Sequence, residues 1–158
     1  MGNRGVSITE VVLALLVSGA IIAGAATSYQ GWLKRYKVEK ATMDLYADLM
    51  KARMLAISRN VDHFAVLNSG SYSLLEDVDG SGRPSNGDIT LATYPKTLEY
   101  ALNRNGSGNK IYFNTRGIMT PERTLWFSTS TDPDYDCLVI SFTRIALGRY
   151  VDGTCKKK

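Results

Sequence analysis

The distribution of apolar residues divides this chain of 158 residues into three regions. Residues 11–29 form an almost unbroken apolar run, in which the polar side chains are Ser18, Thr27 and Ser28. Its length is close to the roughly 20 residues that a transmembrane helix requires. The run therefore predicts a membrane-spanning helix.

An amphipathic helical pattern follows this run and continues to about Arg59. Apolar residues recur at steps of three and four, which predicts one buried helix face; they are Val38, Ala41, Leu45, Leu49, Ala52 and Ala56. A second apolar row consists of Met43, Tyr46, Met50, Met54 and Ile57, and a polar ridge of Lys37, Lys40, Asp44, Asp48 and Lys51. This wide apolar arc suits a helix covered by its own domain on one side and by other helices on another. Without a proline, a single helix from Val6 could reach about 80 Å.

Short β-branched and aromatic runs, separated by Gly, Asn and Ser, replace the helical pattern after Asn60. They predict strands at residues 63–67, 72–75, 89–94, 110–114, 124–128 and 138–143. The tripeptide Asn68-Ser69-Gly70 predicts a hairpin turn between the first two. About 100 residues are enough for one core. The predicted fold class is therefore α+β, with a long N-terminal helix packed on a C-terminal antiparallel β-domain.

The sequence GVSITE, from Gly5 to Glu10, resembles the class III signal of type IV pilins and type II secretion pseudopilins. In that family a prepilin peptidase cuts after the glycine and N-methylates the next residue. The resemblance implies cleavage after Gly5 and an N-methylated terminus at Val6, where most members have phenylalanine. Thr27 stands where major pilins often have proline, which suggests a minor subunit.

Glu10 is the single charged residue in this apolar stretch. An acidic side chain at membrane depth costs roughly 2.5 to 3.5 kcal/mol, so it requires a partner. A helix N-terminus supplies only about 0.3 to 1 kcal/mol, but a free α-amine is mostly cationic near neutrality. The hypothesis is that Glu10 pairs with the Val6 amine of a neighbouring subunit or of its own chain. In the alternative, the Glu10 side chain extends to water at the membrane interface.

Three later segments are similar to the GspH/FimT group of minor pseudopilins and minor pilins: ARMLAISRN, IYFNTRG and CLVISFTRIALGRY, within residues 41–151. The resemblance implies a structural subunit that initiates or caps a type IV pilus or a type II secretion pseudopilus. Its expected partners are other pilins or pseudopilins through the N-terminal helix, the prepilin peptidase and the inner-membrane assembly platform.

The two resemblances imply four regions and a location. These regions are a leader at residues 1–5, a transmembrane and filament-core helix at 6–33, an amphipathic helix at 34–60 and a β-rich domain at 61–158. The precursor is expected to cross the bacterial inner membrane once, with the β-domain in the periplasm and later on the filament. Two alternatives are a secreted domain, cut near Ala23-Gly24-Ala25, and a membrane-anchored periplasmic domain unrelated to filaments.

The net charge of +4 is concentrated behind the apolar run, because residues 34–59 hold seven basic and three acidic side chains. Lys34, Arg35 and Lys37 would place this end in the cytoplasm by the positive-inside rule, against the family orientation. They either contact anionic headgroups or form a solvated helix face. Asp132, Asp134 and Asp136 are expected to form a solvated acidic turn.

Cys137 and Cys155 are the only cysteines. An even pair outside the membrane suits a disulfide in an oxidising periplasm, and it would stabilise the fold by roughly 3 kcal/mol in the chain-entropy model. The alternative is two separate reduced thiols.

The loop from Asp77 to Asp88 has the pattern of an EF-hand calcium loop. Oxygen ligands occur at positions 1, 3 and 5, glycine at position 6 and a carboxylate at position 12. The predicted structural Ca²⁺ site comprises Asp77, Asp79, Ser81, the Arg83 carbonyl and Asp88. In the alternative, this Gly-rich and Asp-rich segment is an ordinary hairpin loop.

Enzymatic activity is not expected, because His63 is the only histidine and no P-loop is present. DNA binding is the stronger alternative function. Some FimT-type pilins bind DNA through a basic C-terminal Gly-Arg-x-Arg motif, which this chain matches only at Gly148-Arg149. The candidate phosphate contacts are Arg149, Lys156, Lys157 and Lys158; the last three otherwise form a soluble tail.

Overall fold

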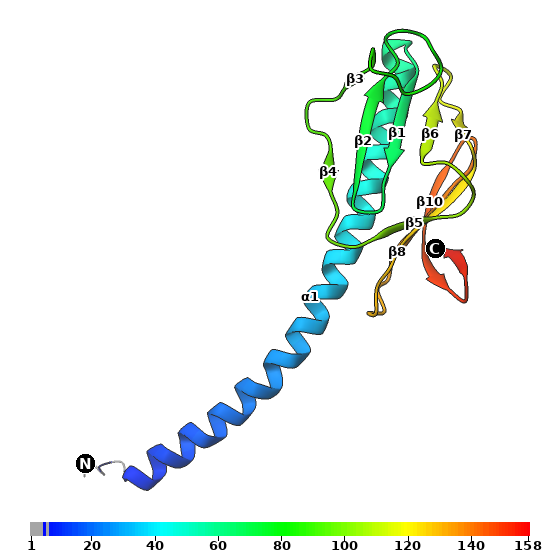
Figure 1. The fold of residues 1–158 in the computed structure, drawn as a ribbon. Coiled ribbons are helices and arrows are strands. Elements are labelled where there is room, and N and C mark those ends of the chain that lie inside the picture. The colour runs from blue at the N-terminus through cyan, green and yellow to red at the C-terminus, as the bar shows by residue number, and fades with distance from the viewer. Residues whose placement is uncertain (1–4, 6) are drawn as a thin grey trace.

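The computed structural model describes Gly5 and residues 7–158, apart from the side chains of residue 23 and residues 25–28. One helix, α1 (Ile8–Arg59, 52 residues), leads into a domain of short strands. Only the second half of α1 lies against that domain, and the first half projects away from it (Figure 1). The α+β fold class predicted from the sequence is confirmed. The leader residues 1–4 and Val6 lie outside the described residues.

Eleven strands are described in two antiparallel sheets. The first sheet has the order β3-β2-β1-β6-β7, with β4 also pairing with β2; its strands are β1 (His63–Leu67), β2 (Ser71–Glu76), β3 (Ile89–Thr90), β4 (Lys96–Thr97), β6 (Lys110–Phe113) and β7 (Met119–Thr120). The second sheet has the order β11-β10-β9-β8-β5; its strands are β5 (Leu102–Arg104), β8 (Arg123–Phe127), β9 (Cys137–Ile140), β10 (Ile145–Val151) and β11 (Thr154–Lys157).

The predicted hairpin between β1 and β2 is confirmed, and Asn68 N–H donates to the Ser71 carbonyl at 2.8 Å. The strand predicted at 89–94 is too long, because pairing with β2 stops at Thr90. The longest strand, β10, was missed, although Asp152-Gly153 is a strong hairpin signal. Both residues have positive φ, at 52° and 76°, as the tight turn into β11 requires.

The core lies where α1 crosses both sheets. The predicted helix face is confirmed, since five of its side chains are fully buried: Val38, Leu45, Leu49, Ala52 and Ala56. Thr42 is buried on the same face, and its hydroxyl donates to the Val38 carbonyl at 2.9 Å. The strands contribute buried side chains from both sheets, among them Leu67, Leu74, Ile111, Phe113, Leu125, Phe127, Leu138 and Ile140. One core therefore holds the helix and both sheets together.

Asp48 differs from the other residues of the predicted polar ridge, which are exposed. Its side chain is buried, and it accepts hydrogen bonds from the Tyr72 hydroxyl at 2.5 Å and from Lys96 Nζ at 2.6 Å. Burial alone would raise the pKa of Asp48, but these two donors lower it overall. The carboxylate thus connects α1 to β2 and β4.

Asp48→Asn is expected to destabilise the domain most at neutral pH. A lowered folded-state pKa means that the carboxylate contributes stability above its unfolded pKa of about 3.9, and that this contribution is lost as the pH falls through the folded value. Urea unfolding from pH 7 to pH 2 measures this effect, with the exposed Asp44→Asn as the control. A difference between wild type and Asp48→Asn that did not shrink below about pH 4 would contradict the assignment.

In the part of the chain that the structure describes, no helix combines the length and the apolar character that crossing a membrane requires. The transmembrane role expected for residues 6–33 stays a prediction.

Candidate functional site

The first half of α1 carries an extended exposed apolar surface. Large apolar side chains project from it without contact to the β-domain: Ile8, Leu13, Leu15, Leu16, Ile21 and Ile22 are between 64% and 83% exposed. Soluble monomers rarely expose apolar patches of this extent, so such a surface indicates binding to a protein or a membrane. This half of α1 therefore extends beyond the folded domain as a helix with an exposed apolar surface (Figure 1).

Glu10 lies in the first turn of this exposed segment. Ser7 occupies the N-cap position, and its carbonyl accepts hydrogen bonds from the N–H groups of Glu10 and Val11 at 3.0 and 3.2 Å. The Glu10 side chain has no hydrogen-bond or ion-pair partner within Gly5 and residues 7–158. Its position near the positive end of the helix dipole agrees with the sequence argument, and pairing with the Val6 amine stays a hypothesis.

Cys137 and Cys155 form the expected disulfide, with Cα atoms 6.0 Å apart. It joins β9 to β11, and these two strands are separated by β10. Gly148 of β10 lies beneath the bridge, paired with Cys137 on one side and Lys157 on the other. A Cβ on Gly148 would lie 2.4 Å from the Lys156 carbonyl oxygen and 2.9 Å from Cys155 Sγ. Gly148 therefore permits the bridge to cross the central strand.

The loop after β2 brings together the residues of the predicted calcium site. One carboxylate oxygen from each of Asp77, Asp79 and Asp88 lies within 4.8 Å of the others. Ser81 is close to them, since its N–H donates to Asp77 and Asp79 at 3.0 and 2.9 Å. Its hydroxyl donates to the Arg83 carbonyl at 2.7 Å. All five predicted ligand residues are thus neighbours in space.

The carboxylates of this loop differ in their surroundings. Burial raises the pKa of Asp77, although two backbone N–H groups donate to it. Hydrogen bonds from Ser85 and Ser81 lower the pKa of Asp79 to about 2. Asp88 Oδ1 is buried without a hydrogen-bond partner in the described part of the chain. Hard oxygen donors in this arrangement suit Ca²⁺, and the site stays a prediction.

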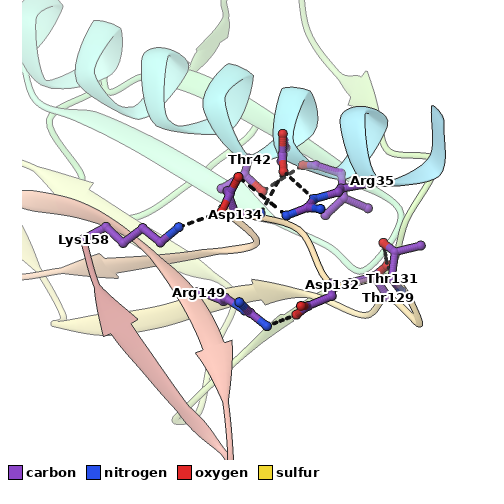
Figure 2. Close-up of polar contacts among 10 residues, drawn as sticks. Arg35, Thr42, Thr129, Thr131, Asp132, Asp134, Arg149 and Lys158 are labelled. Carbon is purple, nitrogen blue, oxygen red and sulfur yellow. Dashed lines mark hydrogen bonds and ion pairs between the residues drawn. The ribbon is translucent and has the colours of Figure 1, made fainter. Parts of the chain in front are cut away.

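The acidic turn at 132–136 is not merely solvated. Asp132 accepts a hydrogen bond from Arg149, and Asp134 accepts one from Lys158 at 2.8 Å (Figure 2). Arg35 of α1 also lies 3.6 Å from Asp134 (Figure 2). Asp136 is buried and accepts the Tyr150 N–H at 2.6 Å.

These ion pairs bear on the predicted DNA contacts. Two of the four candidates, Arg149 and Lys158, already have a carboxylate partner, so less of their charge is available to a phosphate. Lys156 and Lys157 are exposed on β11. DNA binding stays a prediction, with these two lysines as its best candidates.

Comparison with known structures finds a protein of similar fold. The fold is similar to the crystal structure of the minor pseudopilin EpsH from the type II secretion system of Vibrio cholerae, with a TM-score of 0.50 and 14% identity. The match covers 72% of this chain and 96% of that one. At this identity, the likeness establishes the fold.

The family follows from the sequence. The family model described as Type II transport protein GspH matches residues 41–143. The chain belongs to this family, and the resemblance to the GspH/FimT group is confirmed. A search among curated proteins finds no match.

Added Ca²⁺ is expected to bind this loop with one ion per chain. The three carboxylates repel one another without a cation, and a bound Ca²⁺ would remove this repulsion. Because the ion binds the folded chain, a free Ca²⁺ concentration of ten times the Kd should raise the free energy of unfolding by about 1.4 kcal/mol. Isothermal titration calorimetry of the full chain in detergent measures the binding, and Asp79→Asn should weaken it. The matched control is Asp152→Asn, which removes an equal charge at an exposed turn. The absence of calcium heat at millimolar concentration would dispose of the site.

Gly148→Ala is expected to destabilise the protein by about 1 to 3 kcal/mol, because the added methyl group overlaps a backbone carbonyl and the disulfide. Urea unfolding of the oxidised full chain measures the change. Gly70→Ala is the control, since nothing lies within 4 Å of a Cβ built there. Equal stabilities for the two variants would show that β10 and the bridge can separate easily.

Proposed function

We propose that this protein is a minor pseudopilin of a type II secretion system, processed after Gly5 and incorporated into the pseudopilus through α1. The observation that carries the proposal is the contrast between the two halves of one helix. The second half is buried by the β-domain, whereas the first half exposes apolar side chains that require another partner. Membership of the GspH family and the likeness to EpsH support the type II system over a type IV pilus.

In this proposal, neighbouring subunits cover the exposed half of α1. Apolar side chains on all its sides suit a helix surrounded by other helices. Nothing lies within 4 Å of a Cβ placed on Gly19 or Gly31, so both positions leave room for close helix approach. The β-domain then lies at the outside of the filament, where a low-abundance subunit initiates or caps assembly.

Cleavage after Gly5 would create the charge that Glu10 needs. The new α-amine on Val6 is mostly cationic near neutrality, and N-methylation preserves that charge. Glu10 would neutralise the amine of a neighbouring subunit, or its own, once both groups leave water.

Enzymatic activity remains unexpected, and the family assignment gives DNA capture no additional support.

Glu10→Ala is expected to be processed normally but to be lost from the pseudopilus. Removing one partner of a buried ion pair costs roughly 3 to 5 kcal/mol, which predicts at least a hundredfold loss of incorporation. Sheared pseudopili from cells that express each variant measure incorporation by immunoblot.

The matched control is Glu122→Ala, which removes an exposed carboxylate from the β-domain. Mass spectrometry should find N-methylated Val6 as the first residue in the wild type and both variants. Normal incorporation of Glu10→Ala would overturn the role of Glu10. A wild-type chain that starts near Ala26 would overturn the pseudopilin assignment itself.

A further inference from the structure

Three aromatic side chains form a ladder on α1 where the helix leaves the β-domain. The ring centroids of Tyr29 and Trp32 are 6.0 Å apart, and those of Trp32 and Tyr36 are 5.7 Å apart. All three rings are exposed, by 60%, 58% and 50%. A row of exposed rings with polar edges is an unusual covering for a solvated helix, and it is typical of a membrane–water interface.

Basic side chains are interleaved with this ladder and extend beyond it. Two of them already have acidic partners: Arg35 lies near Glu39 and Asp134, and Lys37 Nζ lies 2.8 Å from Glu99. Lys34 and Lys40 are exposed and have no ion-pair partner among the residues that the structure describes. Lys40 lies one helical turn beyond Tyr36, on the same side as the ladder. Two cations are therefore available to an external anion.

The order of side chains along the helix axis is the third observation. Exposed apolar side chains between Ile8 and Ile22 extend over about 21 Å, and the ladder occupies about 10 Å further along. Lys34 lies in the second half of the ladder, and Lys40 lies beyond its far end. A bilayer presents the same sequence of environments, from hydrocarbon through the interface to the charged headgroups. An isolated nucleic-acid strand offers no counterpart to the apolar segment.

We infer that Tyr29, Trp32, Lys34, Tyr36 and Lys40 form a lipid collar that binds the anionic phospholipid surface of a bilayer. The rings lie at the interface, and Lys34 and Lys40 contact headgroup phosphates. The inference goes beyond the pseudopilin assignment, because it concerns a lipid preference of the single chain and requires no filament.

The test measures the distribution of the full chain between two vesicle populations. The protein is diluted from detergent into an equal mixture of phosphatidylcholine vesicles and vesicles that also contain about 30% phosphatidylglycerol, and the two are separated by density. Each lysine near an anionic surface strengthens binding about fivefold. Lys34→Gln combined with Lys40→Gln should therefore reduce the preference for anionic vesicles by about thirtyfold, and high salt should reduce it in the wild type.

The matched control is Lys156→Gln combined with Lys157→Gln, which removes the same charge from exposed positions on β11. This variant should keep most of the wild-type preference. Trp32 supplies a second measurement in a Trp126→Phe background, where lipids labelled near the headgroup should quench its emission more than lipids labelled at the chain end. Circular dichroism should show equal helix content for all variants.

Three results would overturn the inference. The first is an even distribution of the wild type between the two vesicle populations. The second is loss of the preference in the β11 variant but not in the collar variant, which would place the lipid contacts on the C-terminal hairpin. The third is quenching of Trp32 by an oligonucleotide that also releases the chain from vesicles. Each result leaves the incorporation test of Glu10 unaffected, so the two proposals can fail separately.

Discussion

The burial of one face of α1 is the constraint on which the domain depends. Along this face two large side chains, Leu45 and Leu49, are followed by two small ones, Ala52 and Ala56, and all four are fully buried. The apolar residues of both sheets join one core with this helix face, so both sheets lose part of their buried contacts if the face is lost. The Asp48 contacts add a polar connection on the same helix to β2 and β4.

The helix α1 is continuous, although its second half belongs to the folded core and its first half is exposed. Its hydrogen-bonded backbone runs continuously from Ile8 to Arg59, so the position of the exposed half follows from the packing of the buried half. Polar contacts reinforce this relation where the helix emerges. Arg35 lies 3.6 Å from the Asp134 carboxylate (Figure 2), and the Asp134 N–H donates to Glu39 at 2.7 Å. The free half is therefore presented at a defined angle to the domain.

Patterns in the sequence predicted the structural features that depend on residues close to one another in the chain. Helical periodicity identified the buried face of α1, and short β-branched and aromatic runs on either side of a turn signal identified the β1–β2 hairpin. The clustering of the residues of the predicted calcium loop could be anticipated because they are close in sequence. In contrast, the two-residue strands β3, β4 and β7 exist only through pairing with strands already in place. The burial of Asp48 could not be predicted, because Lys96, its partner, is 48 residues away. The need for Gly148 likewise became apparent only once β10 lay under the disulfide.

The crossing of the disulfide above Gly148 also limits how this sequence can diverge over generations. A larger residue at this position conflicts with the Lys156 carbonyl of β11 as well as with Cys155 Sγ, so loss of the bridge alone leaves the closer, backbone conflict in place. The requirement for glycine therefore comes mainly from the close approach of β11 and only in part from the cysteines. Gly148 should consequently be retained even in descendants that have lost both cysteines.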